Sequence, residues 1–117
     1  MHHNPQLLSA GSINGDHVRN AQGESVGNIK ELMIDLSSGR VAYAVLSFGG
    51  FMGLGDKLFA IPWPALTLDA QNQEFVLDVS PEKLENAPGF DKDNWPNMAD
   101  REWASSIYSY YDINPYW

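Results

Sequence analysis

The sequence lacks cysteine altogether, so none of its 117 residues can form a disulfide or supply a thiolate metal ligand. A single domain of this length buries roughly two-thirds of its unfolded surface, and we expect a hydrophobic core to hold the fold together without either. No apolar run approaches the ~20 residues that span a bilayer. The N-terminal stretch 1–10 has neither the basic start nor the apolar run of a secretory signal. We therefore expect a soluble, cytoplasmic protein with no direct membrane insertion.

Positive charge is also scarce. Seven lysines and arginines stand against 15 acidic residues, which gives a net charge of −8, and the seven cations form no basic stripe. Phosphate backbones and anionic membrane surfaces repel such a chain. The composition therefore argues against nucleic acid as a partner, whereas a basic protein remains compatible.

What the sequence does contain is a series of short apolar segments bounded by turn residues, a pattern typical of β-strands. After a disordered lead-in over 1–9, we predict six strands, over residues 10–20, 26–36, 40–48, 58–61, 66–68 and 74–79. In segment 26–36 the two-residue apolar period slips at Ile29, which indicates a β-bulge or strong coiling. Six short strands joined by tight turns favour a small barrel or sandwich.

Segment 40–48 is apolar on both of its faces. Tyr43 shares one face with Val41 and Val45, and Phe48 shares the other with Ala44 and Leu46. A strand of this kind needs cover on both sides. The domain core supplies one cover, and a helix, a tail or a partner must supply the other.

Two helices are predicted after the strands. Ser80 and Pro81 are typical of a helix start, and Pro88 with Gly89 closes this short helix. A second helix is predicted from about 98 to 111, with Asn97 as its cap. Its apolar face consists of Ala99, Trp103, Ile107 and Tyr110 or Tyr111.

Several of these segments resemble the PRC-barrel family, which is named for the cytoplasmic barrel of the photosynthetic reaction-centre H subunit. The motifs that carry the resemblance are Val-Gly-Asn-Ile-Lys-Glu-Leu at 26–32 with Asp35, Gly-Arg-Val-Ala-Tyr-Ala-Val-Leu at 39–46, Gly-Gly-Phe-Met-Gly-Leu-Gly-Asp-Lys at 49–57 and Ala-Ile-Pro-Trp at 60–63. The resemblance, which covers about residues 13–84, implies an all-β fold, a small, strongly coiled antiparallel β-barrel, and we place this domain over 10–88. The helix and the aromatic residues predicted after it make 89–117 a C-terminal helical, aromatic tail.

The resemblance also implies a role in binding and assembly. Members of the family include stand-alone bacterial proteins and the C-terminal domain of a ribosome-maturation factor that handles a small-subunit ribosomal protein. The family has no shared catalytic motif, so the resemblance assigns no catalytic residue. A non-catalytic, self-associating protein-binding module is the first hypothesis, and binding of a ribosomal protein is the alternative.

The glycine-rich loop 49–57 offers a third hypothesis, a small-ligand or nucleotide site. A phosphate-binding P-loop needs Gly-Lys followed by Ser or Thr at a helix start, whereas Gly55, Asp56 and Lys57 run into a strand. A structural hairpin loop is therefore the better interpretation. The loop also presents Phe51, Met52 and Leu54, which either form an interface or pack under the tail.

No other motif amounts to a catalytic or metal site. Asp91 and Asp93 are spaced as in a calcium loop, but Trp95 and Pro96 stand where an oxygen ligand and a glycine are needed. His17 has no ligand partner near it in sequence, and no serine has a Gly-x-Ser-x-Gly context. We therefore expect no enzyme activity, cofactor or metal.

The tail concentrates seven aromatic residues between 95 and 117. It either covers the barrel's own second apolar face or docks on a neighbouring subunit, because Trp and Tyr are common interface anchors. We predict a homodimer in which barrel faces and tail take part. The candidate interface residues are Tyr43, Phe48, Phe51, Met52, Leu54, Trp63, Trp103, Ile107, Tyr110, Tyr111 and Trp117.

Overall fold

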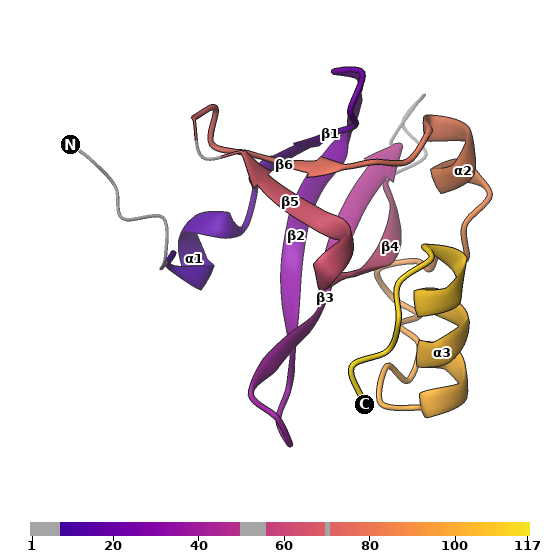
Figure 1. The fold of residues 1–117 in the computed structure, drawn as a ribbon. Coiled ribbons are helices and arrows are strands. Elements are labelled where there is room, and N and C mark those ends of the chain that lie inside the picture. The colour runs from indigo at the N-terminus through magenta and orange to yellow at the C-terminus, as the bar shows by residue number, and fades with distance from the viewer. Residues whose placement is uncertain (1–7, 50–55, 70) are drawn as a thin grey trace.

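Six strands form one sheet that curls into a half-barrel in the computed structural model, with short helices at its margins (Figure 1). The structure describes residues 8–49, 56–69 and 71–117. In chain order the elements are α1 (Ala10–Ile13), β1 (His17–Arg19), β2 (Ser25–Asp35), β3 (Arg40–Gly49), β4 (Asp56–Pro62), the 3₁₀ turn η2 (Trp63–Ala65), β5 (Leu66–Asp69), β6 (Glu74–Leu77), α2 (Pro81–Glu85) and α3 (Arg101–Tyr110). The predicted all-β fold with a short helix and a C-terminal helix is confirmed.

The strands lie in the order β4-β3-β2-β1-β6-β5. Neighbouring strands pair antiparallel except β1 and β6, which run parallel with Val18 opposite Phe75. Because β1 and β6 come from the two ends of the barrel sequence, this pairing joins its beginning to its end. The two long central strands, β2 and β3, form a hairpin that extends beyond the rest of the sheet (Figure 1).

The slip in the apolar period of β2, which predicted a β-bulge or strong coiling, corresponds to irregular pairing between β2 and β3. The register shifts between Ile29 and Glu31 and again between Met33 and Ile34. A second constraint acts at Gly27, whose φ is 126°. A Cβ at this position would lie 2.1 Å from the carbonyl oxygen of Ser47 on β3, so only glycine lets the two backbones approach this closely.

The tail supplies the second cover that β3 needs. Helix α3 lies beside the sheet (Figure 1), and its residues Ile107 and Tyr108 are fully buried. The Tyr43 ring of β3 meets the ring of Tyr108 edge-on at 5.6 Å, and the Tyr108 hydroxyl donates to the Ala42 carbonyl at 2.9 Å. Of the two alternatives for the tail, the structure shows the cover within the chain.

Two predicted elements are wrong at their N-terminal ends. The strand predicted over 10–20 is a strand only over His17–Arg19, because α1 takes its first part and the Ser12 amide bonds the Ser9 carbonyl. Helix α3 begins at Arg101, with Asp100 as its cap rather than Asn97. The Asn97 side chain instead accepts the Ala99 amide in the preceding turn.

The buried face of α3 also differs from the prediction. Ile107 and Tyr111 are buried as expected and Trp103 packs half-buried against the core, but Ala99 is exposed, and Ala104 and Tyr108 complete the buried face. The start of α2 is confirmed, since the Ser80 hydroxyl accepts the Lys83 amide at 3.0 Å. Among the described residues, no helix is long and apolar enough to cross a membrane.

The outer edge of β4 is paired with the segment that leads into the tail. The Leu58 amide donates to the Phe90 carbonyl at 2.9 Å, and the Phe90 amide donates back to the Leu58 carbonyl at 2.8 Å. The Phe90 ring contacts Trp95, with ring centres 5.1 Å apart. This two-bond bridge fixes where the segment leaves the barrel.

The close contact at Gly27 generates the first prediction. Gly27→Ala should lower the free energy of unfolding by more than about 2 kcal/mol, because the new methyl group meets a backbone carbonyl as well as an unfavourable φ. Gly23→Ala is the control, since Gly23 also has a positive φ but nothing lies near its added Cβ. Its cost should be about 1 kcal/mol. Urea denaturation of both variants is the measurement, and equal losses would contradict the proposed close approach.

Candidate functional site

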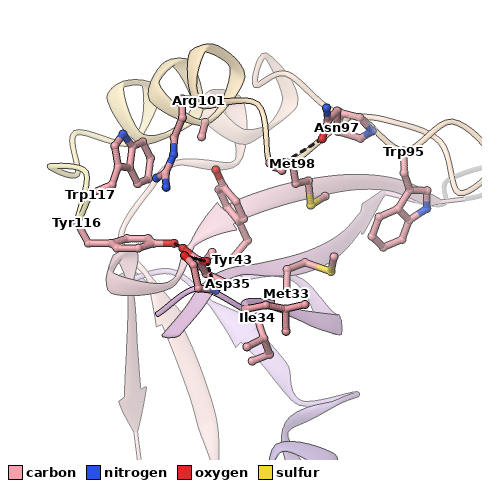
Figure 2. Close-up of a pocket in the computed structure, with 16 residues that line it drawn as sticks. Met33, Ile34, Asp35, Tyr43, Trp95, Asn97, Met98, Arg101, Tyr116 and Trp117 are labelled. Carbon is pink, nitrogen blue, oxygen red and sulfur yellow. Dashed lines mark hydrogen bonds between the residues drawn. The ribbon is translucent and has the colours of Figure 1, made fainter. Parts of the chain in front are cut away.

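A pocket of about 610 Å³ lies between the β2–β3 hairpin and the C-terminal segment (Figure 2). We call it the tail pocket. Its lining comes from residues 33–37 of the hairpin, Ala42 and Tyr43 of β3, residues 95–99, Arg101 and Ala104 of α3, and the pair Tyr116 and Trp117. The volume is within the range of about 300–1,000 Å³ that is usual for binding sites.

Exposed apolar side chains gather at this pocket. Among the described residues, five large hydrophobic side chains are exposed, and four of them line the pocket: Ile34, Leu36, Trp95 and Trp117. The fifth, Leu8, precedes α1. Leu36, beside the hairpin turn, is 93% exposed. Single exposed hydrophobic residues are ordinary, whereas exposed apolar side chains gathered in one place are typical of interaction surfaces.

A hydrogen bond ties the hairpin to the C-terminal segment at one end of the pocket. The Tyr116 hydroxyl donates to one Asp35 carboxylate oxygen at 2.5 Å, and the backbone amide and hydroxyl of Ser37 donate to the other at 3.0 and 2.7 Å. These donors, Tyr116 first, lower the pKa of Asp35 from 3.8 to about 2. Burial, and then the bond to Asp35, raise the pKa of Tyr116.

Two arginines lie on the aromatic rings at the same end. The Arg40 guanidinium is 5.0 Å from the ring centre of Tyr116, and that of Arg101 is 4.8 Å from the ring centre of Trp117. Within the described part of the chain, neither guanidinium forms an ion pair. Arg101 also lines the pocket, and its charge contributes to the lowered pKa of Asp35.

The inner wall holds a buried hydroxyl without a partner. Tyr43 is 2% exposed, and its ring lies 5.5 Å from that of Trp103. In the described residues, two buried hydroxyls lack a hydrogen bond, those of Tyr43 and Tyr111. Burial raises the pKa of both. Such groups are rare in native proteins because losing water without gaining a partner is costly.

Of the predicted interface residues that the structure describes, the pocket brings together two, Tyr43 and Trp117. Ile107 and Tyr111 are buried inside the chain. The other described candidates are half-buried against neighbours of their own chain: Trp103 on Tyr43, Phe48 on Phe59, Trp63 on Phe75, and Tyr110, whose hydroxyl donates to the Lys83 carbonyl. Phe51, Met52 and Leu54 lie outside the described residues.

Sequence reasoning missed the hairpin side of the pocket. Ile34 and Leu36 flank Asp35 just before the turn, and they were assigned only to a strand. Their spacing of two residues, next to a predicted hairpin turn, indicates two apolar side chains on the same side of an exposed hairpin end. This pattern could have indicated an interaction surface. Arg101 could have been found as the lone cation among the tail aromatics, but its contact with Trp117 requires the fold.

His17, which has no ligand partner near it in the sequence, has two side-chain partners in the fold. Its Nδ1 is 2.8 Å from a Glu74 oxygen and its Nε2 is 2.9 Å from the Ser25 hydroxyl. Glu74 also accepts from Arg19, whose guanidinium reaches Asp69 as well. The bond from His17 and then that from Arg19 lower the pKa of Glu74. This network links β1, β2, β5 and β6.

The chain of bonds from Ser25 through His17 to Glu74 has the connectivity of a hydrolase triad. A hydrolase also needs oxyanion donors and a substrate cleft beside the serine. Ser25 begins β2, whereas the tail pocket lies at the opposite end of that strand. We therefore interpret the network as a polar tie between strands. Among the described residues, no group of three or more potential metal ligands is found.

The bond between Tyr116 and Asp35 generates the second prediction. Tyr116→Phe should raise the pKa of Asp35 from about 2 toward 3.8, because the largest stabilising donor is lost. A carboxyl group whose pKa is lower in the folded state stabilises the fold at every pH above its pKa in the unfolded chain. This stabilisation is lost as the pH falls through the pKa of the folded state. The variant should therefore be less stable near neutral pH and lose less stability between pH 3.8 and about 2.

Carboxyl NMR titration of Asp35 and urea denaturation across this pH range measure both effects. Tyr110→Phe is the matched control, because the Tyr110 hydroxyl donates to a backbone carbonyl and not to a carboxylate. An Asp35 pKa that is unchanged in Tyr116→Phe would show that the bond does not form in solution.

The unpaired hydroxyls generate the third prediction. Tyr43→Phe and Tyr111→Phe should each raise the free energy of unfolding by about 1 kcal/mol, because each removes a buried donor that has no acceptor. Tyr108→Phe should lower it by about 1 kcal/mol, because its hydroxyl has the Ala42 carbonyl as acceptor. Urea denaturation decides the signs. A loss of stability in all three variants would show that the Tyr43 and Tyr111 hydroxyls are bonded.

Comparison with known proteins identifies the family. The model of the PRC-barrel domain matches residues 5–84, well over half of the chain and all six strands. No curated protein matches this sequence. PRC-barrel domains are generally non-catalytic modules of protein interaction and assembly. With the curled six-stranded sheet already described, the match shows that the chain belongs to the PRC-barrel domain family.

Proposed function

We propose that this chain is a non-catalytic protein-binding module that self-associates, with the tail pocket as its contact surface. The observation that carries the proposal is that four of the five exposed large hydrophobic side chains of the described residues line this one pocket. The general role of PRC-barrel domains in assembly is consistent with it.

The chemistry of the pocket favours binding over catalysis. Asp35 and Arg101 are the charged residues in its described lining. A general acid or base needs a pKa near the working pH, and the pKa of Asp35 is about 2. Arginine stays protonated at any physiological pH. These two groups are therefore suited to orient a partner rather than to transfer a proton.

The position of the tail determines how self-association can occur. Because α3 buries Ile107 and Tyr108, the tail is part of each copy's own core. Trp117, by contrast, remains 41% exposed at the pocket. We therefore propose contact through exposed pocket residues and not through exchange of whole tails. Removing the tail would expose the core, so point substitutions are the better test.

The fourth prediction concerns the mass in solution. Light scattering of the full chain should give twice its mass of 13.0 kDa. The double variant Ile34→Thr and Leu36→Ser should raise the dissociation constant by at least about 100-fold, because each lost apolar contact is worth about 1.5 kcal/mol or more. Thr keeps the β-branched shape that suits the strand.

Leu8→Ser is the matched control, since Leu8 is also a large apolar residue, is about as exposed as Ile34, and does not line the pocket. Circular dichroism should show the same fold in all the variants. A dimer that dissociates only in the double variant supports the proposal. A full chain that is monomeric at every concentration rules out self-association.

A further inference from the structure

We infer that Ser25 is a site of covalent acylation, with His17 as its general base and Glu74 as the residue that positions His17. The acyl donor is a neutral activated ester, in which the carbonyl carbon carries a good leaving group. The site lies at the start of β2, whereas the tail pocket lies at the opposite end of that strand. The inference is therefore independent of the proposed function.

Three strands bring together a hydroxyl, an imidazole and a carboxylate. His17 begins β1, Ser25 begins β2 and Glu74 begins β6. The Ser25 Oγ is 2.9 Å from Nε2 of His17, and Nδ1 of the same ring is 2.8 Å from a Glu74 oxygen. Both distances are within hydrogen-bond reach. The order is that of a nucleophile, its base and the group that orients the base.

The charge of Glu74 determines the direction of both bonds. The bonds from His17 and then from Arg19 lower the pKa of Glu74, so its carboxyl group is ionised near neutral pH and can only accept. Nδ1 of His17 therefore carries a proton. In the neutral ring the lone pair is then on Nε2, which accepts from the Ser25 hydroxyl. This tautomer is the one that can remove a proton from serine.

The strand pairing holds the three groups in place. β1 pairs with β2 on one side, where Arg19 is opposite Ser25, and with β6 on the other. Arg19 also donates to the second Glu74 oxygen at 3.0 Å and to Asp69 of β5 at 2.9 Å. The charged groups that contact His17, directly or through Arg19, are therefore Glu74 and Asp69. Because Glu74 is bonded through both oxygens, the one that accepts from His17 has a fixed position.

The Ser25 hydroxyl is accessible, but the site is not built for turnover. Ser25 is exposed, and the His17 side chain is 42% exposed, so a small ester can reach Oγ. The backbone amides of Gly23 and Glu24, just before Ser25, already donate to Asn20 and are not free to stabilise an oxyanion. Such a donor contributes about 100-fold or more to the rate. We therefore expect a stoichiometric reaction that ends at the acylated serine.

The reaction is an acyl transfer without oxidation or reduction. The Ser25 Oγ forms a bond to the carbonyl carbon of the ester while its proton passes to Nε2 of His17. The bond between the carbonyl carbon and the leaving oxygen then breaks, and His17 returns the proton to that oxygen. The products are an ester of Ser25 and the alcohol of the leaving group. A neutral donor suits a chain with a net charge of −8, which repels anions.

The test treats the full chain with para-nitrophenyl acetate and locates acetyl groups by peptide mass spectrometry. Ser25 should be acetylated at least about tenfold faster than Ser37, because a general base usually contributes more than this. Ser37 is the matched comparison, since its exposed hydroxyl donates directly to the Asp35 carboxylate with no imidazole between them. The rate at Ser25 should increase with pH over the range in which imidazole loses its proton, because only the neutral ring accepts.

Variants at four positions assign the roles. Ser25→Ala should remove the label, and His17→Gln should lower the rate at residue 25 to that of Ser37, because an amide can bond the hydroxyl but is not a base. Glu74→Gln should lower the rate at least about tenfold, and Glu74→Asp should retain part of it, because the carboxylate selects the tautomer. Asp69→Asn is the control within the network, since Asp69 contacts Arg19 but not His17. It should leave the rate unchanged.

The outcomes are distinguishable from those for the proposed function. Acetylation of Ser25 no faster than that of Ser37, or a fast rate that survives His17→Gln, overturns the inference. An equal loss of rate in Asp69→Asn and Glu74→Gln overturns the positioning role of Glu74. Release of para-nitrophenol beyond one equivalent per chain that Ser25→Ala abolishes overturns the stoichiometric limit. None of these results changes the dimerisation expected through Ile34 and Leu36, and a monomeric chain leaves the acylation of Ser25 unaffected.

Discussion

The cover that α3 places on β3 is the contact on which the rest of the structure depends, because β3 is apolar on both faces. Tyr108 carries this contact, since it is fully buried and its hydroxyl satisfies the Ala42 carbonyl. To reach β3 the chain must turn back from the Phe90 bridge, and the return path brings residues 95–101 over the end of the β2–β3 hairpin. The tail pocket is therefore a consequence of covering the core.

Much of the fold could be predicted because it is encoded locally. The alternation of apolar residues, the slipped period at Ile29 and the Ser80–Pro81 helix start all correspond to features of the structure. The errors arose where two local signals compete, as at Asn97 and Asp100, which are both good caps only three residues apart. The pocket could not be predicted, because Leu36, Trp95 and Trp117 converge only through the path of the tail.

The charges show a similar division between local and distant information. The sequence shows an acidic chain with scattered cations, but the fold places several carboxylates against donors from other strands. Glu74 and Asp69 both accept hydrogen bonds from Arg19. Asp35 accepts one from Tyr116, which is 81 positions away in the sequence. The pKa of each carboxyl group is lowered, by Tyr116 and then Ser37 at Asp35, by Asn72 and then Arg19 at Asp69, and by His17 and then Arg19 at Glu74. At the pocket end the ionised Asp35 lies near Arg101, and Arg40 lies on the Tyr116 ring, so charges of both signs meet there.

The bridge between Leu58 and Phe90 has a consequence for aggregation. A half-barrel has open edges, and an edge strand with free amides and carbonyls is a template on which another chain can add a strand. On β4 the Leu58 backbone is already paired with Phe90, and Pro62 at the end of the strand has no amide to offer. Phe90, near the start of the tail, thus occupies backbone hydrogen-bonding groups of β4 that another strand would otherwise use. Open-ended strand addition, which builds fibres, is thereby disfavoured at the β4 edge.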